Sequence, residues 1–428
     1  MKKIFLLLPL LMATLYSSAQ VTREEMMKNI CQTAGTYYPY WGGKAKLTPA
    51  PEGYQPFYIS HYGRHGSRYL TKHDSYHKLI PLLEKAQEKG VLTSQGKKTL
   101  KQMKKAYSYA KGKSGQLSIL GGRQHEGIAQ RMGKNFPEVF QSGCFVDARS
   151  TQVGRCQESM AHFCGQLKKD FPYLDISQQS NREDYYFMAN RTDSVKSVPA
   201  SKAIKEGAYA FRNKMRSTPD PWPRLISDPA FIKKYVKDKS AYNMYLFDIV
   251  TNMMCHPEQG IRFSGEFTKE ELFCLWQAKN IQWTISTGTI DGVTPRYQRI
   301  YGLIRNFIVW ADEVIAQGTR GASLRFGHDS FVYPLAYALH LDHCDDVPQG
   351  NYEELYRHMA NFKIIPMAGN VQLIFYRKPG SDDILVKFLL QEEEKHIPVP
   401  TDVWPYYHWN DVRKYYLDMV AQKQIKTD

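Results

Sequence analysis

Past residue 19, the sequence has no apolar run long enough to cross a membrane as a helix, so we expect no membrane span. It also lacks a block of Lys and Arg and any nucleic-acid-binding motif; the basic residues are spread along the chain, and no nucleic-acid partner is expected. Gly112-Lys113-Ser114 ends like a phosphate-binding P-loop, but Tyr107 stands where that loop needs Gly. No internal repeat is visible. These absences argue against a helical membrane protein, a P-loop NTPase and a repeat protein.

The composition that is present is that of an ordinary globular protein of 428 residues, 43% hydrophobic and 23% charged. This length allows a large core and predicts two domains. The seven cysteines are an odd number, so at least one thiol should be free, and no disulfide pair can be assigned. Cys156 and Cys164 are predicted to share one helix about two turns apart, which is too far for a disulfide between them.

The first 19 residues have the pattern of a signal peptide. Two lysines precede an apolar run at 4–15, and small residues precede a predicted cleavage site after Ala19. We therefore expect an exported protein, periplasmic or secreted. Cleavage would remove Lys2 and Lys3 and lower the formal charge from +15 by two, and the remaining excess favours a polyanionic substrate.

The stretch 57–72 is the one around which the rest of the chain is organised. Residues 57–62 are β-branched and aromatic, as in a strand, and Gly63 and Gly66 predict a tight turn where the backbone approaches another group. Thr71, with an acidic residue three positions later, predicts the N-cap of a helix that runs to residue 89. A strand therefore leads into a loop that faces a helix N-terminus, which suits an anion.

The loop carries Arg64, His65 and Arg68. Arginine forks match the oxygens of a phosphate group. A histidine among arginines should lose its proton easily, because the nearby positive charges disfavour imidazolium. A neutral imidazole beside a bound phosphate is a candidate nucleophile. By itself this short string could also be a turn with solvated charges.

Two more junctions of a strand with a helix carry residues of the same kind. Arg149 follows a predicted strand at 145–148 and precedes Ser150 and Thr151, which are good N-cap residues. Later, a buried-type strand at 322–326 leads through a glycine to His328 and Asp329, which open a helix at 331–341. The carboxyl ends of parallel strands lie at one edge of a sheet, so the three junctions can converge there.

Between residues 189 and 290 the alternation of strands and helices stops, and a proline-rich segment at 219–223 interrupts a helical pattern. We interpret 189–290 as an inserted α-helical cap domain, and 20–188 with 291–428 as the α/β domain. Further helices are predicted at 94–111, 123–136, 296–316 and 410–423, and strands at 371–376, at 384–390 and somewhere within 176–188.

At this point the sequence resembles the histidine acid phosphatases, the branch of the histidine phosphatase superfamily that contains phytases and multiple inositol polyphosphate phosphatases. Five motifs carry the resemblance: Gly63-Arg64-His65-Gly66-Ser67-Arg68, Leu120-Gly121 with Gln124, Arg149-Ser150-Thr151 with Arg155, Gly327-His328-Asp329, and Pro366-Met367-Ala368-Gly369-Asn370. They fall within 54–190 and 290–395. The resemblance implies a phosphoglycerate-mutase-like α/β sandwich domain with an inserted, mostly helical cap.

The resemblance also implies roles for site residues. His65 corresponds to a nucleophile that forms a phosphohistidine, and Asp329 to the proton donor. The phosphate is bound by four residues: Arg64, Arg68, Arg149 and His328. Thr71 and Lys72 resemble a Thr-Lys pair of some bacterial phytases and are possible substrate contacts, which favours a polyphosphorylated substrate.

These residues suit phosphoryl transfer, which depends on positioning and charge stabilisation. Guanidinium groups can neutralise the phosphoryl oxygens, so no metal and no cofactor are implied. The leaving alcohol needs a proton, which a protonated Asp329 can supply, so we expect activity at acidic pH. The expected function is an exported acid phosphatase that acts on a small anionic phosphorylated substrate, with phytate or other inositol polyphosphates favoured.

Several alternatives stay open at this stage. The substrate could instead be a sugar phosphate such as glucose 1-phosphate, or the protein could bind a phosphorylated ligand without catalysis. Arg149 could be a surface ion-pair partner, Asp329 a plain N-cap and Lys72 a solvated lysine. The sequence makes no prediction of oligomeric state.

Overall fold

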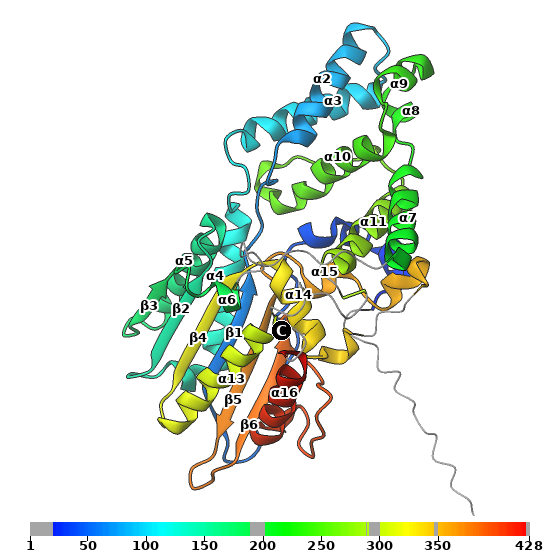
Figure 1. Ribbon diagram of the computed structural model, residues 1–428. Coiled ribbons are helices and arrows are strands. Elements are labelled where there is room, and N and C mark those ends of the chain that lie inside the picture. Colours follow the sequence, from blue (N-terminus) through cyan, green and yellow to red (C-terminus); the bar gives the residue numbers. More distant parts are fainter. Residues whose placement is uncertain (1–19, 189–201, 288, 291–299, 346–349, 425–428) are drawn as a thin grey trace, which may run out of the picture.

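The computed structural model describes residues 20–188, 202–287, 289–290, 300–345 and 350–424. Figure 1 shows a sheet covered by helices on both faces, with a group of helices beyond one end of its strands. The fold class is therefore α/β with a helical addition, as predicted. The predicted signal peptide at 1–19 and the first part of the predicted cap, 189–201, lie outside the described residues.

The sheet has eight described strands and is mixed. In sheet order they are β3 (Ile176–Gln179), β2 (Phe145–Ser150), β4 (Gly321–Gly327), β1 (Gln55–Arg64), β5 (Asn370–Arg377), β6 (Ile384–Leu390) and β7 (Glu393–Glu394), with β8 (Tyr406–His408) also paired to β6. The first four in this order are parallel, and β5 runs antiparallel to β1. Arg64 lies opposite Gly327 in the register, so the carboxyl ends of β1 and β4 meet at one edge as predicted.

Helices cover both faces of the sheet because its central strands are apolar on both sides. On one face, α4 (Ile119–Asn135) and α5 (Gly154–Asp170) pack against side chains such as Ile59 and Phe326. On the other face lie α13 (Ile300–Ala316), α14 (Asp329–Ala338) and α16 (Trp409–Gln424), packed against side chains such as Tyr58 and Phe375. Each fully buried side chain of this size contributes about 1.5–3 kcal/mol. This burial makes the sheet a rigid support for the residues at its edge.

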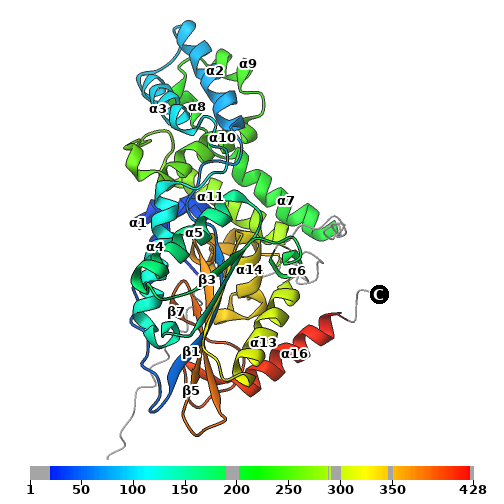
Figure 2. The same ribbon diagram turned by 90° about the vertical axis from the view of Figure 1, so that its left-hand side faces the viewer.

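The helical part contains α7 (Lys202–Ser217), α8 (Trp222–Leu225), α9 (Pro229–Tyr235), α10 (Lys239–Asn252) and α11 (Lys269–Thr287), all from the predicted cap range. Figures 1 and 2 show that α2 (Asp74–Glu88) and α3 (Ser94–Ala110) belong to it as well. Leu79 and Leu100 share one core with Trp222 and Leu246. The sequence analysis assigned α2 and α3 to the α/β domain, whereas their packing places them with the cap helices. The remainder of the domain division stays a prediction.

Two predicted helix N-caps are wrong. Helix α2 begins at Asp74 with His73 as its N-cap, so Thr71 does not cap it. Helix α5 begins at Gly154 with Val153 as its N-cap, three residues after the start predicted from Ser150 and Thr151. The reason is that the strand continues: the amide of Thr151 still donates to the carbonyl of Phe326 in β4, at 3.1 Å.

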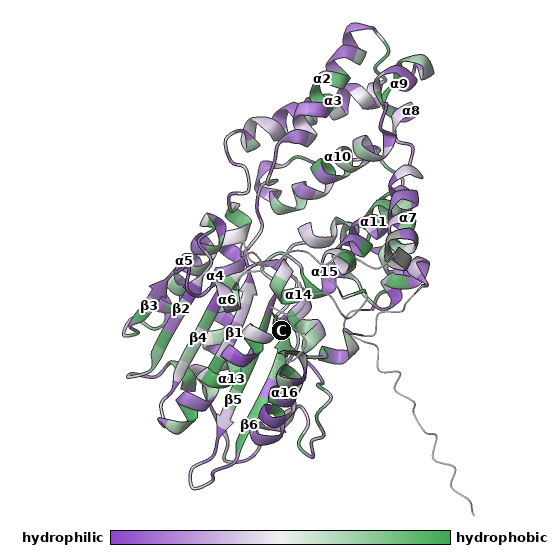
Figure 3. Ribbon diagram, in the orientation of Figure 1, coloured by the Kyte–Doolittle hydropathy of each residue, from purple (hydrophilic) through white to green (hydrophobic). Residues whose placement is uncertain are grey.

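Short helices complete the described chain: α1 (Arg23–Lys28), α6 (Tyr185–Met188) and α15 (Asn361–Ile364), with 3-10 turns η1 (Ile30–Tyr37), η2 (Pro137–Phe140), η3 (Met253–Cys255), η4 (Pro257–Gln259), η5 (Leu341–His343) and η6 (Tyr352–Arg357). Figure 3 shows the sheet strands with hydrophobic residues and the outer helices with many hydrophilic ones. Within the described ranges, no helix combines the length and apolar character that a membrane crossing needs. All seven cysteines are described and none forms a disulfide, and Cys156 and Cys164 share α5 as predicted.

Candidate active site

The loop after β1 is held by backbone hydrogen bonds from three separate parts of the chain. The amide of His65 donates to the carbonyl of Gly327 at 3.0 Å, and the carbonyl of His65 accepts from the amide of Ala368, also at 3.0 Å. The amide of Ser118, the N-cap of α4, donates to the carbonyl of Ser67 at 2.8 Å. The loop therefore has one well-defined backbone path at the sheet edge.

Side chains of helices α4 and α5 also accept hydrogen bonds from the backbone of this loop. The amide of Gly66 donates to Oγ of Ser159 at 3.1 Å, and the amide of Ser67 donates to Oε1 of Gln124 at 2.8 Å. A Cβ atom on Gly66 would lie 2.4 Å from the carbonyl oxygen of Gly121, so only glycine fits. The predicted close approach at Gly66 is confirmed, whereas Gly63 lies within β1 rather than in a turn.

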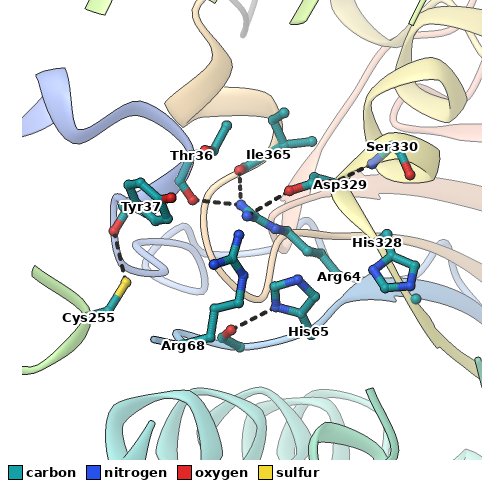
Figure 4. Close-up of polar contacts among 12 residues, drawn as sticks. Thr36, Tyr37, Arg64, His65, Arg68, Cys255, His328, Asp329, Ser330 and Ile365 are labelled. Carbon is teal, nitrogen blue, oxygen red and sulfur yellow. Dashed lines mark hydrogen bonds and ion pairs between the residues drawn. The ribbon is translucent and has the colours of Figure 1, made fainter. Parts of the chain in front are cut away.

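Arg64 is fully buried, and its guanidinium group is held from three sides (Figure 4). Nη1 donates to the carbonyls of Thr36 at 2.8 Å and Ile365 at 2.6 Å. Nη2 forms an ion pair with Oδ2 of Asp329 at 2.7 Å. Burial lowers the pKa of Arg64, and Asp329 opposes that change. The two carbonyls fix the plane of the guanidinium and its direction towards Asp329.

His65 is buried and neutral, and its tautomer follows from one contact. Nδ1 lies 2.9 Å from the carbonyl oxygen of Gly66. A carbonyl oxygen can only accept, so the proton is on Nδ1 and Nε2 carries the lone pair. Burial holds the pKa of His65 well below 6.5, and the charges of Arg64, Arg68 and Arg155 lower it further. The sequence analysis predicted this direction, although burial is the larger cause.

Arg68 and Arg155 bring two more positive charges to His65. Arg68 lies beside His65 and Arg64 in Figure 4, with its guanidinium 5.5 Å from the ring centre of Tyr37. Burial and the charge of Arg68 lower the pKa of Arg155. Among the described residues, the buried Nε atoms of Arg68 and Arg155 have no hydrogen-bond partner. An anion bound between these residues would satisfy both donors and offset the repulsion between like charges.

His328 and Asp329 approach the loop from the start of α14. His328 is the N-cap residue, and its ring centre lies 5.8 Å from that of His65, with Nε2 3.3 Å from Oγ1 of Thr151. Burial lowers the pKa of His328 to about 4, and Asp329 opposes this shift. Oδ1 of Asp329 accepts from the amide of Ser330 at 2.9 Å, and its Oδ2 faces Arg64. The junctions after β1 and β4 therefore meet, and Thr151 shows that the junction after β2 reaches the same place.

The structure does not bring Arg149 to this group, which corrects the predicted phosphate-binding set. Its Nε donates to Oδ2 of Asp147 at 2.7 Å and its Nη1 to Oδ1 of Asp184 at 2.8 Å. The guanidinium lies 5.4 Å from the ring centre of Trp310 on α13, so the side chain points to the α13 face of the sheet. The alternative weighed for Arg149, an ion-pair role, describes its contacts.

Thr71 and Lys72 lie on the connection between the loop and α2, and both side chains are exposed. A Cβ atom placed on Gly115 would touch both Thr71 and Arg155, so Thr71 is at the rim of the site. No such contact relates Lys72 to it among the described residues. A substrate contact by Thr71 or Lys72 stays a prediction.

Sequence reasoning missed Arg155 as a site residue, although the residue was part of the matching motif. Once α5 is known to start at Gly154, Arg155 is in its first turn at the sheet edge. Tyr37 and Thr36, from η1, and Cys255, whose thiol donates to the carbonyl of Tyr37 at 3.6 Å, are also beside the arginines. No local pattern marks those three, because only the tertiary fold brings them to the loop.

The arrangement is a positively charged site around the neutral imidazole of His65. Three guanidinium groups and one carboxylate lie around the neutral His65, so the group has a net positive charge, which suits an anion such as a phosphoryl group. The same positive charge opposes binding of a metal cation. Among the described residues, no three His, Cys, Asp or Glu side chains are grouped as metal ligands.

Comparison with solved structures gives clear similarities in fold. The multiple inositol polyphosphate phosphatase of Bifidobacterium longum, in complex with inositol hexasulfate, matches with a TM-score of 0.71 and 18% identity, covering 90% of this chain and 97% of that one. The phytase from D. castellii matches with a TM-score of 0.67 and 13% identity, covering 95% and 91%. The phytase from Klebsiella sp ASR1 matches with 0.54 and 12%, covering 88% and 96%. No protein-family model and no curated protein matches the sequence. These similarities establish the predicted fold.

Proposed function

We propose that this protein is an exported acid phosphatase that hydrolyses phosphomonoesters through a phosphohistidine, with inositol polyphosphates such as phytate as substrates. The observation that carries the proposal is the neutral His65, whose Nε2 is free for attack while three arginines surround it. The fold similarity to a phosphatase solved with inositol hexasulfate and to phytases supports the substrate class. The positive charge of the chain also favours such a polyanion.

In the first step, Nε2 of His65 attacks phosphorus in line, and the bond between phosphorus and the ester oxygen breaks. Arg64, Arg68 and Arg155 stabilise the charge on the phosphoryl oxygens. A phosphoryl group bound at Arg64 takes over the guanidinium that now pairs with Asp329. The released carboxyl can then hold a proton and give it to the leaving alcohol.

In the second step, water attacks the phosphohistidine, and the bond between phosphorus and Nε2 breaks. The Asp329 carboxylate accepts a proton from this water, which restores the acid for the next cycle. The proton on Nδ1 stays in place throughout, because the carbonyl of Gly66 holds it. Inorganic phosphate and the alcohol are the products, and no other reactant is consumed.

The mechanism is tested by trapping the phosphorylated enzyme from a labelled substrate and comparing the stability of the label in acid and in base. Labelled phosphate from a quenched turnover should remain on the protein under alkaline conditions and be lost in acid, which is the behaviour of phosphohistidine. His65→Ala should abolish both the label and phosphate release. Asp329→Asn should keep the label and slow turnover. Unchanged phosphate release by the His65→Ala variant would disprove the proposal.

The substrate class and the export are tested separately. Rates of phosphate release from phytate, glucose 1-phosphate and an aryl phosphate should rank phytate first in kcat/KM. A higher kcat/KM for glucose 1-phosphate would assign the site to sugar phosphates instead. For export, the protein isolated from its cells should begin at residue 20, and a start at Met1 would contradict the predicted cleavage.

A further inference from the structure

Positive charge is concentrated in one segment of the chain. Residues 89–125 contain eight lysines and one arginine and no Asp or Glu, whereas the whole chain has a net charge of +15. The sequence analysis described the basic residues as spread along the chain, because no more than two of these lysines are adjacent. Five of the eight lysines lie on α3, and a helix brings residues three or four positions apart to one side.

Five lysines of α3 form what we call the lysine face: Lys97, Lys98, Lys101, Lys104 and Lys105. All five are exposed. Three of them continue at intervals of four to Tyr109, which is 41% exposed, so that a straight row of lysines ends in an accessible aromatic ring. Lys104 pairs with Glu84 of α2. The other four have no ion pair among the described residues.

The opposite side of α3 is fixed in the cap core. Leu100, Met103 and Ala106 are buried there with residues of α2 and α8. In Figures 1 and 2, α3 is at the end of the molecule farthest from the sheet, so its exposed side is free to meet a large partner. The helix cannot turn its apolar side outwards without losing this core. Contact with a partner must therefore be mainly electrostatic.

We propose that the lysine face docks the protein onto the surface of an anionic lipid bilayer, independently of the catalytic site. All five cations of the face are lysines, which act as point charges and make no bidentate forks. Lipid headgroups move freely in the plane of the bilayer, so anionic headgroups can gather beneath lysines at any spacing. Each lysine near such a surface contributes about 1 kcal/mol. Tyr109 has the amphipathic character of residues at a bilayer interface.

A nucleic acid fits this surface less well. Binding of single strands uses aromatic side chains on which successive bases stack, and reading of duplex bases uses arginine forks. The lysine face has no arginine and ends in one tyrosine. The phosphate groups of a lipid bilayer complement the charge of the lysine face and need neither stacked aromatic side chains nor arginines.

The test uses the full mature chain and vesicles of phosphatidylcholine, alone or mixed with phosphatidylglycerol. We expect co-sedimentation with the mixed vesicles only, and its loss at high salt. The variant Lys97→Glu, Lys101→Glu, Lys105→Glu should need at least about tenfold more lipid for half-maximal binding. Its hydrolysis of an aryl phosphate should be unchanged, which shows that the variant is folded and that the catalytic site is intact.

The matched control reverses three exposed lysines on other parts of the surface, Lys28→Glu, Lys169→Glu and Lys378→Glu. It changes the net charge by the same amount and should bind mixed vesicles within about threefold of the parent protein. Equal loss of binding in both variants would mean that net charge alone is responsible and would overturn the proposal. So would the absence of vesicle binding by the parent protein. If duplex DNA released the protein from the vesicles at a concentration of DNA phosphate below that of the anionic lipid, the face would be reassigned to nucleic acid.

Discussion

Replacing Arg155 and Arg149 one at a time tests which of the two belongs to the site: the structure places Arg155 beside His65, whereas the sequence predicted Arg149. Arg155→Ala removes one of the three guanidinium groups around His65, where we propose that the phosphoryl group binds. Removing a positioned donor to a developing oxyanion costs about 10²- to 10³-fold in rate. We expect kcat/KM to fall by roughly that factor, because the buried Nε of Arg155 has no competing partner among the described residues. Stability should change little for the same reason.

Arg149→Ala should have the opposite profile. The side chain bonds to Asp147 and Asp184, so its removal leaves two carboxylates without their cation. Asp184 has a side chain only 8% exposed, and loss of its partner should cost roughly 1–3 kcal/mol of unfolding free energy. The kcat/KM should stay within about threefold of the parent value, because Arg149 lies over Trp310 on the α13 face.

The assay is steady-state hydrolysis of an aryl phosphate, whose single phosphate group reports on this site alone. Thermal denaturation of each variant supplies the stability measurement. A third variant, Arg155→Lys, keeps the positive charge but loses the two-pronged hydrogen bonding of the guanidinium, so its kcat/KM should lie between those of the parent protein and Arg155→Ala. The reasoning is refuted if folded Arg149→Ala loses more kcat/KM than Arg155→Ala, since the sequence-based set would then be the correct one.

Three further results are expected. Gly66→Ala should lose nearly all activity, because its Cβ would lie 2.4 Å from the carbonyl oxygen of Gly121. The control Gly165→Ala on α5 should keep full activity, because its Cβ would meet no atom within 4 Å. Equal activity of the two variants would contradict the close packing at Gly66. The pKa values of buried His61 and His125 are lowered to about 3, so the unfolded chain binds protons below pH 6.5 that the folded protein does not. Stability should therefore be complete above pH 6.5 and fall by up to several kcal/mol towards pH 3, and a melting temperature that rises on acidification would oppose this sign. Finally, kcat should peak below pH 7, because Asp329 must carry a proton while His65, with its lowered pKa, stays neutral in mild acid; a profile that peaks in alkali would exclude Asp329 as the acid.

The parts of the site that could be predicted from the sequence are those whose members are neighbours in the chain. Arg64, His65 and Arg68 follow one strand, and His328 and Asp329 follow another, with glycines that permit close backbone contact. Strand periodicity and glycine positions are local properties, so they identified both segments and the α/β class. The rule that parallel strands end at one edge then predicted that these two segments and the junction after β2 meet, which the registers of β1 and β2 with β4 confirm.

What the sequence could not determine is the direction of each side chain and the partners that arrive from afar. Arg149 and Arg155 are both near the end of β2, and the choice between them depends on how far the strand extends along β4 and which face each residue then occupies. The lysines of α3 look dispersed in the chain, and they become one face only because the opposite side of the helix is buried against the cap. The sequence alone determines which reactive residues are neighbours in the chain. The direction of each side chain depends on packing against segments far away in the chain, and this packing exists only in the folded protein.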